Sequence, residues 1–208
     1  YTPFLVELTN VARPGKNHLI VSVDNLWDAR LAPRAGEHQF NGGIYRDVQL
    51  ILTEFCGIDE YGVFVQTTKL ERENEDPNGW NATVKIETQV FEQRSQIDEP
   101  LFLETCILDG ETVLAKEISR INMKTEGEID SEKKDRNSTS SLNSKTITQQ
   151  ISLSGIQPWS PNSPKLYTVV SRVSYNGILV DCVLTKFGIR TVRFDKDNGF
   201  FLNGEHFA

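Results

Sequence analysis

Regular alternation of apolar and polar residues is the feature that most constrains the fold of this chain. Between Asn81 and Glu92 the even-numbered side chains are apolar or uncharged: Ala82, Val84, Ile86, Thr88 and Val90. Charged and amide side chains stand between them: Lys85, Glu87 and Gln89. Successive side chains of a strand point to opposite faces of a sheet. This period of two therefore predicts a strand with one face on a core and the other in water.

Similar patterns recur along the rest of the chain and predict an all-β fold, an antiparallel sandwich. The further expected strands are Tyr61–Thr67, Leu101–Leu108, Thr112–Ile121, Thr146–Leu153, Leu166–Tyr175 and Ile178–Phe187. Asp109-Gly110 and Asn176-Gly177 each separate two such runs, as expected for type I′ hairpin turns. No long stretch carries a helical apolar stripe, so helices should be few and short.

Residues 1–50 form a separate block with only a few expected strands, at Phe4–Leu8, His18–Asp24 and Ile44–Leu52. A block of this size buries too little apolar surface to be a domain by itself. We therefore expect it to belong to a larger unit. Without the neighbouring strands of that unit, it should be packed less well than the sandwich.

The segment Asn122–Lys145 is rich in Ser, Asn, Glu and Lys and nearly free of apolar residues. Such a segment cannot offset the entropy of ordering by burial. It is expected to be a mobile loop between two strands of the sandwich.

Charge and composition narrow the classes of partner. The chain has 22 Lys and Arg against 29 Asp and Glu, a formal net charge of −7, which disfavours nucleic acid as a partner. Its most apolar run, Gly177–Leu184, is interrupted by Asp181 and is far shorter than the roughly 20 residues of a membrane-spanning helix. No membrane segment and no targeting peptide are expected.

Cysteine and histidine spacing gives no indication of a metal site. Cys56, Cys106 and Cys182 lie far apart in the sequence and are expected to be buried free thiols. The three histidines are solitary, without the pairing typical of zinc ligands. We expect neither a metal nor a cofactor.

Several motifs together resemble glycoside hydrolase family 2, the β-galactosidase and β-glucuronidase family. The first is Gly42-Gly-Ile-Tyr-Arg-Asp-Val48, which precedes an apolar run. Pro158–Tyr167 is similar to the family segment W-S-P-x-x-P-x-L-Y. Phe187–Thr191 and Gly199–Glu205 resemble its F-G-I/F-R and G-F-x-L-N-G runs. These landmarks, with Thr2-Pro3-Phe4, Val21–Asn25 and Tyr61–Thr68, occur in the family's order along the whole chain.

The resemblance implies a part of a larger enzyme. Family members combine a jelly-roll sugar-binding domain, an immunoglobulin-like sandwich and a TIM barrel that carries both catalytic glutamates. On this reading, residues 1–50 are the last strands of a truncated jelly-roll, residues 51–192 are the complete sandwich, and residues 193–208 are a linker into the barrel. Neither catalytic glutamate is expected here. Asn203-Gly204-Glu205 is not their Asn-Glu pair, because Gly204 separates the two residues.

Glu37 is the one residue that the resemblance assigns to function. In the family, the loop before G-G-I-Y-R-D-V brings an acidic residue to the rim of the sugar pocket, where it accepts hydrogen bonds from hydroxyls. The corresponding stretch here is Glu37–Asn41, in which Glu replaces the family's Asp. Glu37 is therefore expected to be close to substrate in the parent enzyme, against the alternative of an exposed loop acid.

The other conspicuous side chains have structural interpretations. Arg46 and Asp47 are expected to bridge a domain junction, against the alternative of substrate contact. Trp159 is expected to pack under a loop, against the alternative of stacking on a sugar, and Tyr167 to act as a corner tyrosine. Trp80 is expected to be a loop aromatic that covers a sheet edge. Trp27 is left open between packing and sugar contact. Asn81 and Asn137 begin N-x-S/T triplets, a pattern of low specificity for glycosylation.

Two functions fit these observations. The first is a non-catalytic part of a β-galactosidase-like hydrolase that positions the barrel for cleavage of O-glycosidic bonds in carbohydrate metabolism. Its partners would be the jelly-roll and TIM barrel of the same chain and, in the parent enzyme, a carbohydrate. The second is a free-standing carbohydrate-binding or adhesive immunoglobulin-like module. The choice between galactoside and glucuronide, homo-oligomer formation, and a periplasmic or cytoplasmic location all stay open.

Overall fold

The computed structural model describes residues 4–24, 42–73, 79–93, 99–123 and 143–207. The chain divides into two compact units, Tyr1–Ile51 and Leu52–Ala208, and we describe each by itself. Strands account for all the regular structure of the described residues, which contain no helix. The predicted all-β fold is confirmed.

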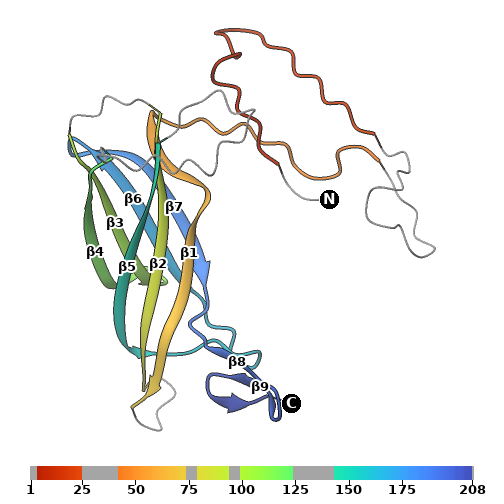
Figure 1. Ribbon diagram of the computed structural model, residues 1–208. Coiled ribbons are helices and arrows are strands. Elements are labelled where there is room, and N and C mark those ends of the chain that lie inside the picture. Colours follow the sequence, from red (N-terminus) through yellow and green to blue (C-terminus); the bar gives the residue numbers. More distant parts are fainter. Residues whose placement is uncertain (1–3, 25–41, 74–78, 94–98, 124–142, 208) are drawn as a thin grey trace. The chain divides into compact units, whose positions relative to one another are not determined.

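The second unit is a sandwich of two antiparallel sheets (Figure 1). One sheet has the order β1-β2-β5 and the other the order β4-β3-β6-β7. The strand bounds are β1 Cys56–Arg72, β2 Trp80–Glu92, β3 Leu101–Asp109, β4 Thr112–Ile121, β5 Asn143–Ile156, β6 Tyr167–Tyr175 and β7 Ile178–Phe187. A smaller sheet follows, of order β10-β9-β8: β8 Val192–Asp195, β9 Gly199–Leu202 and β10 Glu205–His206.

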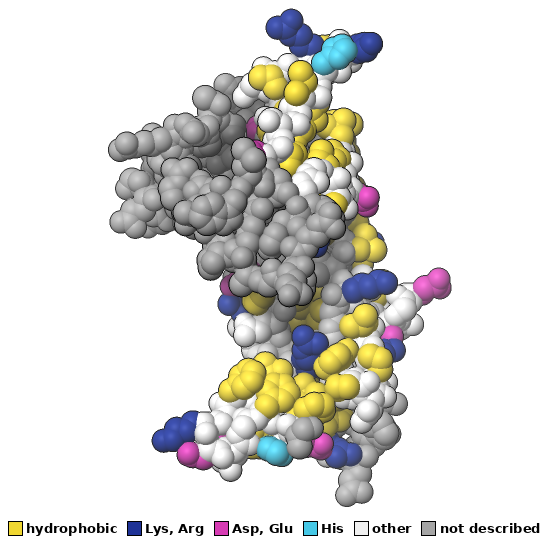
Figure 2. Space-filling view, turned by 90° about the vertical axis from the view of Figure 1, so that its right-hand side faces the viewer, with side chains coloured by type: hydrophobic (Ala, Val, Ile, Leu, Met, Phe, Trp, Pro, Cys, Tyr) yellow, Lys and Arg dark blue, Asp and Glu magenta, His cyan; other side chains and the backbone are white. Residues whose placement is uncertain are grey.

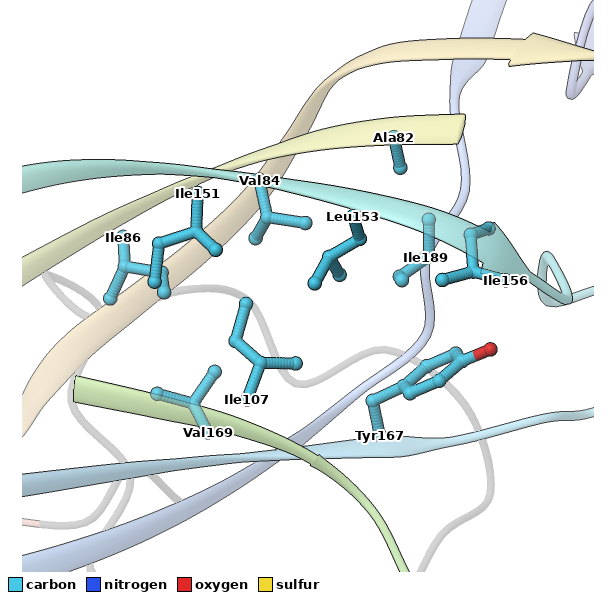
Figure 3. Packing of buried hydrophobic residues seen from close by; sticks show 10 residues of the cluster. All are labelled: Ala82, Val84, Ile86, Ile107, Ile151, Leu153, Ile156, Tyr167, Val169 and Ile189. Atoms are coloured by element: carbon cyan, nitrogen blue, oxygen red, sulfur yellow. The ribbon is translucent and has the colours of Figure 1, made fainter. Parts of the chain in front are cut away.

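The alternation of β2 places its even-numbered side chains between the sheets. Val84, Ile86 and Val90 are completely buried, while Lys85 and Glu87 form an ion pair on the opposite face. Figure 3 shows how Val84 and Ile86 of one sheet face Ile107 and other apolar residues of the opposing sheet. This packing removes apolar surface from water and holds the two layers together.

The buried core is divided into two clusters along the strands. The first cluster consists of Ala82, Val84, Ile86, Ile107, Ile151, Leu153, Ile156, Tyr167, Val169 and Ile189. The second consists of Cys56, Ile58, Val90, Leu101, Leu103, Ile121 and Val173. Each cluster takes residues from both sheets, so each helps to fix the alignment of one sheet on the other.

Tyr167 begins β6 and behaves as the expected corner tyrosine. Its side chain is 2% exposed, and its hydroxyl donates to the carbonyl of Gln157 over 3.1 Å. The same hydroxyl accepts a hydrogen bond from the Gln157 N–H at 2.9 Å. A tyrosine that ties its hydroxyl to upstream backbone in this way is a hallmark of immunoglobulin-like sandwiches.

The two predicted hairpins are present, but only one has the predicted turn. Asn176 and Gly177 connect β6 to β7 with φ values of 50° and 75°, as a type I′ turn requires. In the β3–β4 hairpin the register pairs Asp109 with Thr112, so the turn residues are Gly110 and Glu111. Of these two only Gly110 has positive φ, so the predicted type I′ turn at Asp109-Gly110 is wrong. The turn thus lies one residue later than predicted. The β3–β4 ladder also has a register irregularity between Ile107 and Leu108.

The described residues of the first unit contain no strand, in contrast to the strands expected at Phe4–Leu8, His18–Asp24 and Ile44–Leu52. A strand is defined by hydrogen bonds to a neighbouring strand, and these segments form no such ladder. Their apolar side chains are exposed, for example Phe4 at 76% and Ile20 at 91%. The sequence pattern therefore identified residues with strand propensity but not the pairing that makes a strand.

The segment Asn122–Lys145 is only partly within the described residues. Asn143, Ser144 and Lys145 belong to β5 and pair with β2, so the loop prediction is wrong for these three residues. A polar strand end is stable here because β2 supplies the hydrogen-bonding partner. Residues 124–142 lie outside the described part of the chain, and the expectation of a mobile loop stays a prediction.

Candidate functional site

Three of the sequence motifs meet in space where the sandwich joins the small β8-β9-β10 sheet. We call this set the junction cluster: Trp159, Gly188, Arg190, Thr191 and Asn203. The Trp159 N–H donates to the carbonyl of Ile189 over 2.8 Å, which joins the first motif to the second. Asn203 of the third motif contacts both of the others. Hydrogen bonds thus join the three motifs at one place in the fold.

Asn203 makes the connection through both its backbone and its side chain. Its N–H donates to the Thr191 carbonyl at 2.9 Å, and its Oδ1 accepts from the Thr191 N–H at 3.0 Å. Its Nδ2 donates to the carbonyl of Trp159 at 3.0 Å. Asn203 and Gly204 have φ values of 54° and 84° and connect β9 to β10. An Asn-Gly pair suits such a turn, so this motif has a structural role.

Trp159 packs within the junction cluster, as predicted. A Cβ atom at Gly188 would lie 2.8 Å from both Cβ and Cγ of Trp159, so only glycine allows this approach. The guanidinium carbon of Arg190 lies 4.6 Å from the centroid of the Trp159 ring, within the range of a cation–π interaction. These contacts account for the tryptophan without a sugar on its ring.

The small C-terminal sheet carries an exposed aromatic face. The strands β8, β9 and β10 span residues 192–206. The expectation that residues 193–208 are a linker into a barrel stays a prediction. The rings of Phe194 and Phe200 lie 5.1 Å apart, and those of Phe200 and Phe207 lie 5.9 Å apart. Phe194 is 82% exposed. In Figure 2, hydrophobic side chains gather at the lower end of the view, where this sheet lies. Contiguous exposed apolar surface typically marks an interaction site.

Glu37 and Trp27 lie outside the described residues, and so does Asn137. The expectation that Glu37 contacts substrate therefore stays a prediction. Arg46 and Asp47 are described and exposed, and the Arg46 guanidinium carbon lies 5.5 Å from the Tyr45 ring centroid.

Trp80 belongs to strand β2 and not to a loop, and its ring contacts the Arg72 guanidinium at 5.7 Å from the centroid. Asn81 beside it donates from Nδ2 to Glu73 Oε2 at 3.1 Å.

One group of charged side chains lies on the outward-facing side of the four-stranded sheet. Glu104 pairs with Lys116 of β4 and with Arg172 of β6, the latter at 2.9 Å. The Lys116 ammonium, and then Arg172, lower the pKa of Glu104 below its usual value. A carboxylate that pairs with cationic side chains of the neighbouring strands is typical of a structural ion pair on a sheet.

In the described part of the chain, no group of His, Cys, Asp and Glu side chains is arranged to hold a metal ion.

The cysteines differ in accessibility. Cys56 and Cys106 are buried, whereas Cys182 is exposed, so the expectation of three buried thiols is wrong for Cys182. Cys182 lies on β7, and its side chain is exposed, whereas the next residue, Val183, packs against the second core cluster. Burial, together with the carboxylates of Glu92 and nearby acidic residues, raises the pKa of Cys56 to about 11.

We expect iodoacetamide at about pH 8 to alkylate Cys182 in the folded protein and to leave Cys56 unmodified. The reason is that the thiolate is the reacting form, and both burial and the raised pKa keep Cys56 as the thiol. Mass spectrometry of tryptic peptides measures this, with denatured protein as the reference in which all three cysteines react. A Cys182→Ser variant should lose the alkylation that the folded wild-type protein shows at this position. Equal rates for Cys56 and Cys182 would contradict the buried position of Cys56.

Among the described residues, no helix is long and apolar enough to pass through a membrane.

The family model, the curated relatives and the solved structures that resemble this chain all concern one family of proteins. The family model for glycosyl hydrolases family 2 matches residues 63–190. A β-glucuronidase from Bacteroides fragilis is 27% identical over 210 residues, an alignment that covers 99% of this chain and 27% of that protein. The β-galactosidase BoGH2A from Bacteroides ovatus is 27% identical over 206 residues, covering 98% of this chain and 21% of that protein. The chain thus spans about a quarter of the length of these curated relatives.

Solved structures share the fold. A glycosyl hydrolase family 2 member from Bacteroides cellulosilyticus superposes with a TM-score of 0.57 at 21% identity, over 74% of this chain and 17% of that chain. A putative β-galactosidase from Bacteroides fragilis gives a TM-score of 0.57 at 20% identity, over 75% of this chain and 21% of that chain. At these identities the superpositions show similarity of fold.

Proposed function

This chain belongs to glycosyl hydrolase family 2, and on that premise we propose that it is a non-catalytic part of a hydrolase that cleaves O-glycosidic bonds in carbohydrates. Its role is to hold a catalytic barrel in a fixed position. The proposed partners are the barrel and the remaining jelly-roll strands of the same polypeptide, and the substrate is a β-galactoside or a β-glucuronide. The names of the relatives, β-glucuronidase and β-galactosidase, support this class of substrate.

The observation that carries the proposal is the hydrogen-bonded attachment of the C-terminal sheet to the sandwich. Asn203 fixes this sheet through the carbonyl of Trp159 and the backbone of Thr191. The sheet in turn presents the aromatic face of Phe194, Phe200 and Phe207. An exposed aromatic face on a rigidly attached sheet suits a surface that a following domain covers.

Turnover by the isolated chain tests the proposal directly. We expect no hydrolysis of chromogenic β-galactosides or β-glucuronides by residues 1–208, because cleavage needs two carboxylates held on either side of the glycosidic bond, roughly 5 to 10 Å apart. The polypeptide that carries this chain together with a barrel should be active in the same assay. Turnover by the isolated chain that a single substitution within it abolishes would overturn the proposal. Tight binding of galactose or glucuronate to the isolated chain, by calorimetry, would favour a free-standing carbohydrate-binding module instead.

The junction can be tested with a matched pair of variants. Asn203→Gly keeps the positive φ of its turn but removes two side-chain hydrogen bonds. We expect it to lower the free energy of unfolding by about 1 to 3 kcal/mol, since each such bond contributes about 0.5 to 1.5 kcal/mol. Asn176→Gly makes the same change in the Asn-Gly turn of the β6–β7 hairpin and serves as the control.

In the polypeptide that carries the barrel, Asn203→Gly should also separate the thermal unfolding of the barrel from that of the sandwich. Asn176→Gly should leave a single transition. Identical unfolding of the two variants would contradict a positioning role for the junction cluster.

A further inference from the structure

Four buried polar side chains lie in the middle of the sandwich and are the subject of this inference. Thr88, Thr105 and Ser171 are 0% exposed and Gln149 is 2% exposed. The hydroxyl oxygens of the first three, and Oε1 of Gln149, have no hydrogen-bond partner among the described residues. A buried polar atom without a partner costs about 1 to 3 kcal/mol, so these four atoms together require an explanation.

The four residues occupy one layer of the sandwich. On β2, Thr88 lies between Ile86 of the first core cluster and Val90 of the second. On β3, Thr105 lies between Leu103 of the second cluster and Ile107 of the first.

The same order holds on the two other strands. On β6, Ser171 lies between Val169 of the first cluster and Val173 of the second. On β5, Gln149 lies between Ile151 of the first cluster and Ile147, which packs against the second. Each strand therefore passes from one apolar cluster to the other at its polar residue. We call Thr88, Thr105, Gln149 and Ser171 the polar belt.

Strand pairing brings members of the polar belt close together within each sheet. Thr105 and Ser171 are direct partners across the β3–β6 ladder. Gln149 pairs with Ile86 and Thr88 pairs with Ile147, so Gln149 and Thr88 are diagonal neighbours on the β2–β5 ladder. Two pairs of polar side chains thus face each other from the opposing sheets, whose layers Figure 1 shows.

The chemistry of the polar belt identifies its occupant. The three hydroxyls each donate and accept, whereas Oε1 of Gln149 is a carbonyl oxygen and only accepts. The amide Nε2 of Gln149 donates one hydrogen bond to Ser119 Oγ at 2.9 Å. A ligand for this set must be small and must both donate and accept hydrogen bonds. An apolar ligand would leave all four atoms unpaired, and the four atoms carry no charge that would balance a cation.

We propose that the polar belt is a built-in site for at least one internal water molecule. Buried waters in proteins typically make about three hydrogen bonds to polar groups that have no other partner, and the belt offers four such atoms. The hydrated belt also specifies register, because sliding any of the four strands by two residues would put a polar side chain into an apolar cluster.

Water residence in the folded chain tests the proposal. Oxygen-17 relaxation dispersion detects waters that stay inside a protein for longer than its rotational tumbling time. We expect a signal from at least one such water in the wild-type chain, and its loss in the double variant Thr105→Val/Ser171→Ala. The control is Thr148→Val/Ser152→Ala, the same chemical changes at exposed positions of β5. An equal signal in both variants would overturn the proposal.

A crystal structure of the wild-type chain decides the question even if the double variant does not fold. We expect one or more water peaks within hydrogen-bond distance of at least three members of the polar belt. Hydroxyls bonded directly to one another with no density between the sheets would overturn the proposal. So would density that refines as a metal cation.

Discussion

Ile107→Ala should lower the free energy of unfolding by about 2 to 5 kcal/mol, the range for removing a large aliphatic side chain from a packed core. Ile107 is 0% exposed and belongs to the first core cluster, where Figure 3 shows it beside Val169 and facing the residues of the opposing sheet. The loss combines the transfer free energy of the removed atoms with the cavity that the surrounding side chains do not fill.

Ile118→Ala is the matched control for this prediction. Ile118 lies on β4, next to β3, and its side chain is 56% exposed. The same substitution there should cost at most about 1 kcal/mol, mainly from the lower strand propensity of alanine. Urea denaturation followed by circular dichroism measures both values, provided that the slope m is unchanged. Equal losses would contradict the assignment of Ile107 to the core.

Alternation of residue types was sufficient to predict the sandwich because it records which side of a strand faces the core. The expected run Thr112–Ile121 coincides with β4, and the expected Ile178–Phe187 coincides with β7. The same reasoning failed in the first unit, where Phe4–Leu8 has the composition of a strand but no partner strand among the described residues. Strand propensity is local, whereas a ladder depends on a second segment that composition does not identify.

The polar belt shows a second limit of prediction from the sequence. Thr88 occupies an inward position of the β2 alternation, and its sequence neighbours give no sign that its hydroxyl has no partner. The polar belt becomes apparent only when Thr88 is considered together with Thr105, Gln149 and Ser171, which come from other strands. Threonine is common in strands, so the pattern predicted an ordinary interior position.

The individual motifs of the candidate site could be predicted from the sequence, but the contacts between them could not. The motifs around Trp159, Gly188 and Asn203 were recognisable one by one, but the hydrogen bond from Asn203 to Trp159 joins residues 44 positions apart. Glu37, the residue that the family resemblance assigned to substrate, lies outside the described residues.

Gly188→Ala should destabilise the sandwich by about 2 to 3 kcal/mol, although it adds a single methyl group. The new Cβ would lie 2.8 Å from Cβ and Cγ of Trp159 and 2.9 Å from Cδ1. Trp159 cannot move away without strain, because its N–H is bonded to Ile189 and its carbonyl accepts from Asn203. The methyl group therefore has to displace a backbone segment that is held at two points.

A double-mutant cycle with Trp159→Gly isolates this contact, since glycine at position 159 removes all three atoms that the methyl group would meet. In that background Gly188→Ala should cost little, whereas in the wild-type background it carries the full penalty. The difference between the two costs, measured by urea denaturation, is the interaction energy of the contact. If Gly188→Ala is equally harmful in both backgrounds, the close approach of Trp159 is not the reason for glycine at this position. The β8-β9-β10 sheet would then be held by the hydrogen bonds of Asn203 and not by the packing of Trp159 on Gly188.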